Sequence, residues 1–200
     1  MNEPTRIQRR NRDAILEAGL TVFSQYGFRG TTLDQIATEA SLSKPNVLYY
    51  FASKEAIYIA LLEGLLDTWL DPLRTLDADG DALHELMSYV TRKLEMSRDF
   101  PRESRLFANE ILQGAPHIHG ALTGELKSLV DEKAAVIEAW AAAGRIRPVD
   151  PHHLVFSIWA MTQHYADFDV QVQAVLGGRD PYPGALAHVT MLFERLLTPD

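Results

Sequence analysis

The 200-residue sequence contains no cysteine, which excludes disulfide bonds and metal sites built on thiolates. It also lacks any apolar run close to the roughly 18 residues that a membrane-spanning helix needs. The opening stretch MNEPTRIQRRNRD has no apolar core and therefore does not resemble a secretory signal. These absences argue against a membrane partner, and a chain without cysteine fits a reducing compartment. We therefore expect a cytoplasmic protein.

Positive charge is scarce in the chain as a whole, whose formal net charge is −8. It is nevertheless concentrated near the start of the chain. Residues 1–54 hold seven Lys or Arg and five Asp or Glu, a balance of +2, whereas the remaining residues carry −10. A locally basic segment on an acidic protein indicates a polyanionic partner for that segment alone.

Strand-type alternation and Asn-Gly hairpin turns are missing, and apolar residues recur every three or four positions almost throughout. The pattern predicts a first helix over about 5–26 that ends at Gly27. Thr32, Ser43 and Ser53 are N-cap signals for three further helices. We therefore predict an all-α fold with a three-helix head and a larger helical body. The helix capped by Ser53 is expected to reach about residue 73. Further helices are expected over about 82–99, 102–113, 117–143, 150–168 and 182–197, with a helical turn and loop over 170–181.

Two short helices joined by a tight turn, at about 32–40 and 44–50, are typical of a DNA-reading helix-turn-helix. The start of the second helix enters the major groove in that motif, so Lys44 and Asn46 are placed to reach phosphates or base edges. The predicted DNA-contact set is Arg29, Thr31, Thr32, Ser41, Ser43, Lys44, Pro45, Asn46, Tyr49, Tyr50 and Lys54.

The side chains of this segment divide into contacts and anchors. The hydroxyl groups can donate to phosphate oxygens, and the tyrosine rings can lie along the sugar-phosphate backbone. Val47, Leu48 and Phe51 are expected to point inward and to hold the second helix in place. Periodicity alone leaves open a three-helix subdomain that only packs on the body.

Two stretches of the head carry a resemblance to a known family. They are FSQYGFRGTTLDQIA from Phe23 and SKPNVLYYFASKEA from Ser43. In order and spacing they resemble the DNA-binding domain of TetR-family repressors, over about residues 10–60. The resemblance implies a helix-turn-helix domain at 1–52 and an effector-binding and dimerisation domain at 53–200. It also implies a homodimer joined through the last two helices and a small effector that controls the affinity for double-stranded operator DNA.

The body resembles a subgroup of that family, the pyrimidine-utilisation repressors, so that the likeness covers roughly residues 10–176. It implies release from DNA by uracil or thymine, without any cofactor, and control of pyrimidine catabolism and nitrogen metabolism genes. The segments that carry it include LDTWLDPL from Leu66, KLEMSRDFP from Lys93, SRLF from Ser104 and IWAMTQHYADF from Ile158.

The chemistry of uracil fits several side chains of the body. Its edge alternates carbonyl acceptors with N–H donors, and the primary amide of Gln163 can both donate and accept. Lys93 can donate to a carbonyl oxygen, with Glu110 as its partner or as an N–H acceptor, and the aromatic residues can form the walls. The predicted effector set is Trp69, Lys93, Phe107, Glu110, Trp159, Gln163, His164 and Tyr165.

Simpler roles remain open for several of these residues. A tryptophan on a helix is usually a core residue, and Lys93 can be solvated beside Glu95. His164 and Asp167 can form a structural pair at a dimer interface. A different heterocyclic or hydrophobic effector is the main alternative to a pyrimidine.

An enzyme and a structural adaptor are the rival classes of protein. The histidines of His117-x-His119 and His152-His153 do not have a recognised ligand spacing such as His-Glu-x-x-His. The chain also lacks a glycine-rich phosphate loop. We therefore expect no catalytic residues and no metal site.

Overall fold

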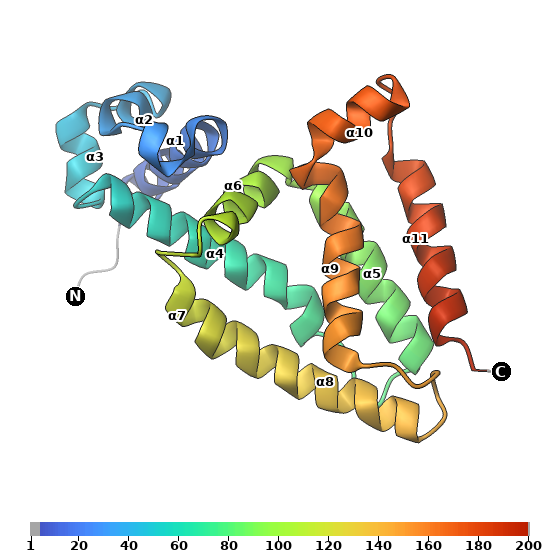
Figure 1. The fold of residues 1–200 in the computed structure, drawn as a ribbon. Coiled ribbons are helices and arrows are strands. Elements are labelled where there is room, and N and C mark those ends of the chain that lie inside the picture. Colours follow the sequence, from blue (N-terminus) through green and yellow to red (C-terminus); the bar gives the residue numbers. More distant parts are fainter. Residues whose placement is uncertain (1–4, 200) are drawn as a thin grey trace. The chain divides into compact units, whose positions relative to one another are not determined.

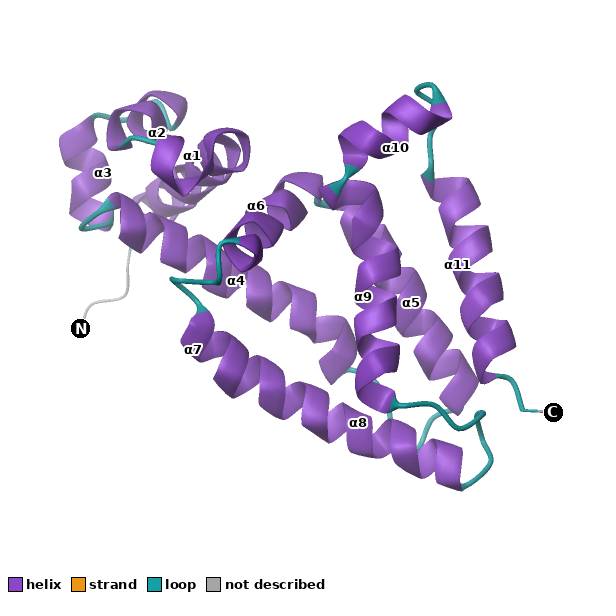
Figure 2. Ribbon diagram, in the orientation of Figure 1, coloured by secondary structure: helices purple, strands orange, loops and turns teal. Residues whose placement is uncertain are grey.

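The computed structural model describes residues 5–199, and within that range every regular element is a helix (Figure 2). The predicted all-α fold is therefore confirmed. Two compact units divide the chain, and each is described separately. The first unit comprises residues up to Leu66 together with Arg105–His119, and the second comprises Asp67–Ser104 with the residues from Gly120 onward.

The first unit is built on an aromatic and aliphatic core. Phe23 and Tyr58 meet edge to face with ring centroids 4.8 Å apart, and Phe28 lies 4.9 Å from Tyr58. Ile36 and Val47 are fully buried. The helices of this unit are α1 (Arg6–Gly30), α2 (Leu33–Glu39), α3 (Lys44–Tyr50), the first part of α4 (Lys54–Arg74) and the second part of α6 (Pro101–Leu112) (Figure 1).

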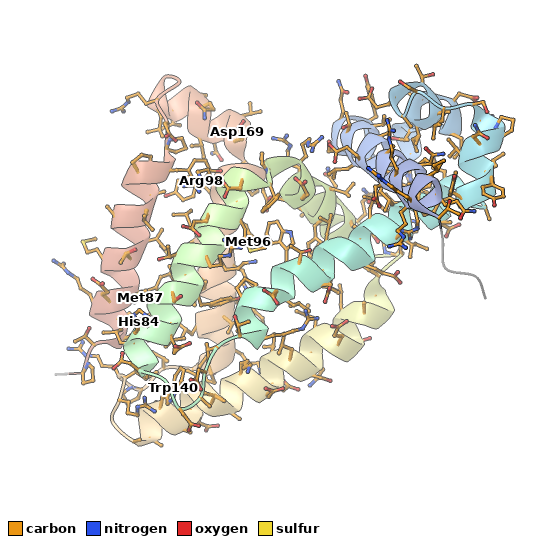
Figure 3. The ribbon with its side chains drawn as sticks, turned by 180° about the vertical axis from the view of Figure 1, so that it is seen from behind. His84, Met87, Met96, Arg98, Trp140 and Asp169 are labelled. Atoms are coloured by element: carbon orange, nitrogen blue, oxygen red, sulfur yellow. The ribbon has the colours of Figure 1, made fainter. Side chains whose placement is uncertain are left out.

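The second unit holds the larger core, where α5 packs against α9 and α11, and α8 packs against α9. Ile158 of α9 and Leu86 of α5 are fully buried there, and Met96 of α5 is nearly so. Figure 3 shows Met87 and Met96 along α5 and Trp140 on α8. Besides the end of α4 and the start of α6, this unit contains α5 (Ala82–Asp99), α7 (His119–Ala121, which begins at the unit boundary), η1 (Leu122–Leu126), α8 (Lys127–Ala142), α9 (Pro151–Asp167), α10 (Asp169–Leu176) and α11 (Tyr182–Leu197).

Most predicted helix limits agree with the structure to within one or two residues. Gly27 interrupts α1 with φ +67° and ψ 174°, a conformation that glycine adopts without steric cost, so the predicted end of the first helix is a kink. The segment predicted as one helix over 117–143 contains the five-residue π-helical stretch η1. The helical turn expected near 170 is longer, since α10 has eight residues.

The compact units do not follow the predicted functional boundary between residues 52 and 53. The first turns of α4 and part of α6 belong with α1–α3 by packing, which the sequence pattern does not reveal. The functional boundary itself stays a prediction. Within residues 5–199, none of the helices combines the length and apolar character that crossing a bilayer requires.

Candidate functional site

The helix-turn-helix of the first unit is shaped by side chains that cap its helices. Thr32 and Gln35 form a reciprocal capping box at the start of α2, with Thr32 N donating to Gln35 Oε1 at 2.7 Å. The turn before α3 passes through Ser41, whose φ of +53° lies in the left-handed region. Ser43 Oγ then accepts the amide N–H of Asn46 at 3.3 Å. Local sequence therefore fixes where α3 begins.

The start of α3 is directed to solvent, and its opposite side is buried. Ser43, Lys44, Pro45 and Asn46 are exposed, as are Thr32, Ser41 and Tyr49, while Val47 and Phe51 are buried. The prediction that Leu48 points inward is wrong, because its side chain is 42% exposed. Val47 and Phe51 are four residues apart and share one face of the helix, which turns Leu48 outward.

Lys44 of α3 has one ion-pair partner within its own motif. Its Nζ lies 2.9 Å from a carboxylate oxygen of Asp34 on α2, and both side chains are largely exposed. A solvent-exposed pair of this kind contributes little stability and exchanges readily for another anion. Lys44 can therefore leave Asp34 and bind a phosphate.

Tyr49 and Tyr50 are oriented by the amide side chains of α1. Gln8 Nε2 donates to the Tyr49 hydroxyl at 3.3 Å, and Asn11 Nδ2 donates to the Tyr50 hydroxyl at 3.1 Å. Each hydroxyl thus uses its oxygen as an acceptor inside the protein. Its own proton is then available to a phosphate oxygen, as the prediction for these residues requires.

Three residues of the predicted DNA-contact set lie near the end of α1, and two of them have internal partners. Thr31 is buried, and its hydroxyl donates to the Gly27 carbonyl at 2.8 Å. Lys54 Nζ donates to the carbonyls of Phe28 and Thr31 at 2.7 Å each. Arg29 is exposed. Thr31 and Lys54 thus stabilise the end of α1, and a DNA contact from either one stays a prediction.

Lys93 is the most unusual charged residue of the second unit. Its side chain is 2% exposed, so the alternative that it is solvated beside Glu95 is wrong. The Nζ atom lies 4.3 Å from the ring centroid of Trp69, which is also buried. Burial lowers the pKa of Lys93 to about 7, and the nearby Asp167 carboxylate opposes that change. Ser104 donates a hydrogen bond to Asp167.

Trp159 and Gln163 lie one turn apart on α9. The indole Nε1 of Trp159 donates to the Tyr89 hydroxyl at 2.7 Å, which ties α9 to α5. Gln163 is half-buried, and its amide has no hydrogen bond to any residue in the range 5–199. Because a half-buried amide without a protein partner is costly unless water or a ligand binds it, Gln163 retains its capacity to bind one.

The remaining predicted effector residues do not form one group with these. His164 is exposed and stacks on Phe168 at 5.1 Å, and Tyr165 lies 6.1 Å from Tyr182. Phe107, which is half-buried, and Glu110, which is buried, belong to the first unit. The structure therefore brings Trp69 and Lys93 into contact, and Trp159 and Gln163 onto one helix face. It gives Glu110 other neighbours.

Two further observations limit the chemistry of the second unit. An open groove of about 270 Å³ lies along α4 and α5, and its lining, which includes Asp71, Glu85 and Arg92, contains none of the predicted effector residues. In the range 5–199, no group of three or more His, Asp or Glu side chains is arranged to hold a metal ion.

Comparison with known proteins places the chain among bacterial regulators. A family model described as bacterial regulatory proteins of the tetR family matches residues 15–61. A second model, the C-terminal region of YcdC-like proteins, matches residues 62–200. The HTH-type transcriptional regulator RutR of Escherichia coli strain K12 is 56% identical over 82% of this chain and 77% of the relative. The HTH-type transcriptional repressor NicS of Pseudomonas putida is 30% identical over 69% of this chain and 65% of the relative.

Solved structures agree in fold. A bacterial regulatory protein in the tetR family from Rhodococcus RHA1 superposes with a TM-score of 0.77 at 23% identity, covering 95% of this chain and 98% of that one. AibR in complex with isovaleryl coenzyme A and operator DNA superposes with a TM-score of 0.74 at 18% identity, covering 95% of this chain and all of the other. At these identities the likeness concerns the fold alone.

Proposed function

Because the chain belongs to the TetR family of DNA-binding transcriptional regulators and is RutR-like, we propose that it is a homodimeric repressor released from operator DNA by a small pyrimidine. Its relatives are regulators and not enzymes, in agreement with the expected absence of catalysis. Uracil and thymine are the proposed effectors, and genes of pyrimidine catabolism and nitrogen metabolism are the proposed targets.

The observation that carries the DNA-binding part of the proposal is the exposed start of α3. Ser43 caps this helix, Lys44 and Asn46 are exposed there, and Tyr49 lies one turn further on. A helix start of this kind fits the major groove, where amide side chains read base edges and cations bind phosphates. The buried Val47 and Phe51 keep that surface in a fixed orientation.

Exposed apolar side chains of α9 and α11 support the homodimer. Phe156 on α9 and Phe168 just after its end are half exposed, and α11 presents Met191, Leu192 and Leu196. Apolar surface of this extent on two adjacent helices is typical of an interface. A second copy on this surface would pair two reading helices, and half-sites of such dimers are spaced by about 34–36 Å.

The support for a pyrimidine comes from the polar groups on α5 and α9. Gln163 offers an amide without a protein partner, one turn from Trp159, and a second indole lies against Lys93. An amide matches the alternating edge of uracil, and the indoles offer flat surfaces for its ring. Thymine adds one methyl group, worth about 1 kcal/mol of burial, so both bases fit the same chemistry.

The test is operator binding with and without uracil. We expect the protein to shift DNA from upstream of its own gene neighbourhood at moderate salt, and uracil to weaken that binding at least ~10-fold. Failure to shift any such DNA would contradict the proposed repressor function. If a different heterocycle binds in a calorimetric panel and releases the DNA, that compound replaces uracil as the proposed effector.

Two variants separate the parts of the proposal. Gln163→Leu should retain operator binding and lose the uracil response, with Gln171→Leu on the exposed side of α10 as the matched control. Lys44→Ala should weaken operator binding by ~1–3 kcal/mol and leave the dimer intact, because it removes a cation from α3 alone. A normal uracil response in Gln163→Leu would exclude the assigned role.

A further inference from the structure

The ammonium group of Lys93 on α5 is buried without an acceptor for its protons. Within residues 5–199, its Nζ atom forms no hydrogen bond and no ion pair, and it lies 4.3 Å from the ring centroid of Trp69. Every fully enclosed side-chain nitrogen or oxygen in this range has a hydrogen-bond partner, so Nζ itself keeps some accessible surface. A cation that is buried, unpaired and still accessible at its charged atom is suited to bind an anion.

The indole of Trp69 and the carboxylate of Asp167 offset the burial of this charge only in part. The ring face attracts the ammonium group, but it provides no oxygen for the three N–H donors. Asp167 on α9 is the charged group that acts on Lys93, and it accepts a hydrogen bond from Ser104. Burial still lowers the pKa of Lys93 to about 7. A negative charge placed beside Nζ would therefore stabilise the protonated form of this side chain.

Uracil and related cyclic imides can supply that negative charge. Each ring N–H lies beside a carbonyl group, so the charge that remains after loss of the proton is spread over the carbonyl oxygens. On binding as an anion, the ring loses the proton of one N–H bond and keeps the electron pair. The proton passes to the amine of Lys93 where that amine is neutral, and to solvent where Lys93 is already protonated. An ammonium group then faces an anionic ring out of water, where their attraction is strong.

We propose that the effector is bound as its ring anion, paired with the ammonium group of Lys93, so that the site selects cyclic imides by the acidity of an N–H group. This inference rests on the proposed function and adds to it the charge state of the effector and the residue that sets it. The amide of Gln163 can still donate to a ring carbonyl in this arrangement. A heterocycle of the same shape without an acidic N–H group is then a weak effector.

The first test compares uracil with 5-fluorouracil, whose fluorine is close to hydrogen in size and makes the ring N–H groups more acidic. Calorimetry on the DNA-free protein at pH 7 gives the two Kd values. If the anion is the bound form, a difference in acidity appears in full as a difference in Kd, and we expect 5-fluorouracil to bind ~10-fold more tightly or better.

The variant Lys93→Met keeps the length of the side chain and removes its charge. We expect it to bind uracil at least ~10-fold more weakly, because the anion loses its partner, and to bind the two rings within ~3-fold of each other. The matched control is Lys127→Met on α8, where the side chain is mostly exposed. This control should retain both the wild-type affinities and the preference for the more acidic ring.

The second test counts protons, from the dependence of the binding enthalpy on the ionisation enthalpy of the buffer. Because Lys93 has a pKa of about 7, it is mostly protonated in the free protein at about pH 6, and anion binding there should release close to one proton. At about pH 8 the proton moves from the ring to Lys93, and almost none should be exchanged with the buffer. A neutral ring bound to the ammonium group would instead take up close to one proton at about pH 8.

Proton uptake at about pH 8, or equal affinities of the two rings for the wild-type protein, would overturn the ion pair even if uracil releases the operator. Failure of uracil to bind would contradict the proposed effector instead. The ion pair is then judged with barbiturate, a ring of similar shape that is anionic at neutral pH. Barbiturate should bind the wild-type protein, and at least ~10-fold more weakly to Lys93→Met. Equal binding by the two proteins, or none, overturns the inference there as well.

Discussion

The two units differ in how their polar side chains are held. The caps that place the reading helix use near neighbours: Thr32 pairs with Gln35, and Ser43 with Asn46, in each case three residues along the chain. In the second unit the partners are distant, as between Trp159 and Tyr89, which are 70 residues apart. The start of the reading helix is thus specified by local sequence, whereas the candidate effector site depends on the packing of α5 against α9.

The largest effect is expected from a charge placed beneath the reading helix. Val47→Asp puts a carboxylate at a fully buried position, which costs several kcal/mol and should lower operator affinity at least ~100-fold. Leu48→Asp places the same charge one residue further on, at an exposed position, and should leave the fold of the motif intact. Circular dichroism melts and operator titrations of the two variants distinguish these outcomes. Equal loss of folding in both would show that the motif does not bury Val47 selectively.

A smaller, pH-dependent effect is expected from Lys93 in the second unit. The pKa of Lys93 is about 7 in the folded protein, against an ordinary value of 10.5. Between pH 7 and pH 10.5 the Lys93 side chain is therefore protonated in the unfolded chain and largely neutral in the folded protein. Burial of Lys93 therefore lowers the free energy of unfolding by its full amount below pH 7, and by less and less as the pH rises toward 10.5. The Tm of Lys93→Met relative to wild type should therefore be higher at pH 7 than at pH 10, by ~4 °C or more.

The control for this measurement is Lys127→Met on the surface of α8, where the side chain is mostly exposed. Its Tm difference from wild type should vary little over the same pH range. A Tm difference for Lys93→Met that is equally flat would show that Lys93 keeps its proton in the folded protein.

Breaking the long-range hydrogen bond of the second unit should cost about 1 kcal/mol. Trp159→Phe leaves the buried Tyr89 hydroxyl without its donor, and the double variant with Tyr89→Phe removes both polar groups. We expect the double variant to recover part of the stability lost in the single one, as measured by urea unfolding. Additive losses would mean that the hydrogen bond contributes nothing beyond packing.

The smallest effects are expected from the helix caps, which occur in both units. Thr32→Ala removes the cap of α2. Asp150→Ala removes the cap of α9, where Asp150 Oδ1 accepts the N–H of His153 at 2.9 Å. Each change should cost ~0.5–1 kcal/mol, because one amide at the helix start loses its acceptor. Hydrogen exchange should quicken in α2 or α9 alone. Exchange that quickens in the other unit as well would contradict the local character of the caps.

The same difference explains how much of the protein could be predicted from its sequence. Caps and most helix limits follow from interactions between residues a few positions apart, and these were predicted correctly. The interruption at Gly27 was located, but as the end of a helix and not as the kink that the structure has. The prediction that Leu48 points inward was wrong, because a seven-residue helix has too few turns to define its buried face. Lys54 donates to the carbonyls of Phe28 and Thr31, which are 26 and 23 residues away and which no local pattern reveals as its partners.

The candidate effector site shows the limit most clearly. Sequence chemistry selected Lys93, Trp69 and Gln163 as polar or aromatic residues in apolar helices, and the structure places the first two in contact. Glu110 was selected for the same reason, as a partner of Lys93. Its actual partner His117 follows a tight turn in which Ala115 has a φ of +54°. The path of that turn decides which side chain meets the acid, and residue composition does not encode it.

The π-helical stretch η1 determines how this part of the chain responds to the deletion of a residue. A π-helical segment holds one residue more than a regular helix over the same distance, and each residue of a helix turns it by about 100°. Deleting Gly124 would therefore let η1 become a regular helix with α8 in its present register. Deleting Asp131, within the regular helix α8, would instead turn the residues that follow it by about 100°. Ile137 and Trp140 would leave the core, and polar side chains would take their places. In α8 a change in the number of residues is therefore more damaging than a change in their identity, whereas η1 can lose one residue and leave the register of α8 unchanged.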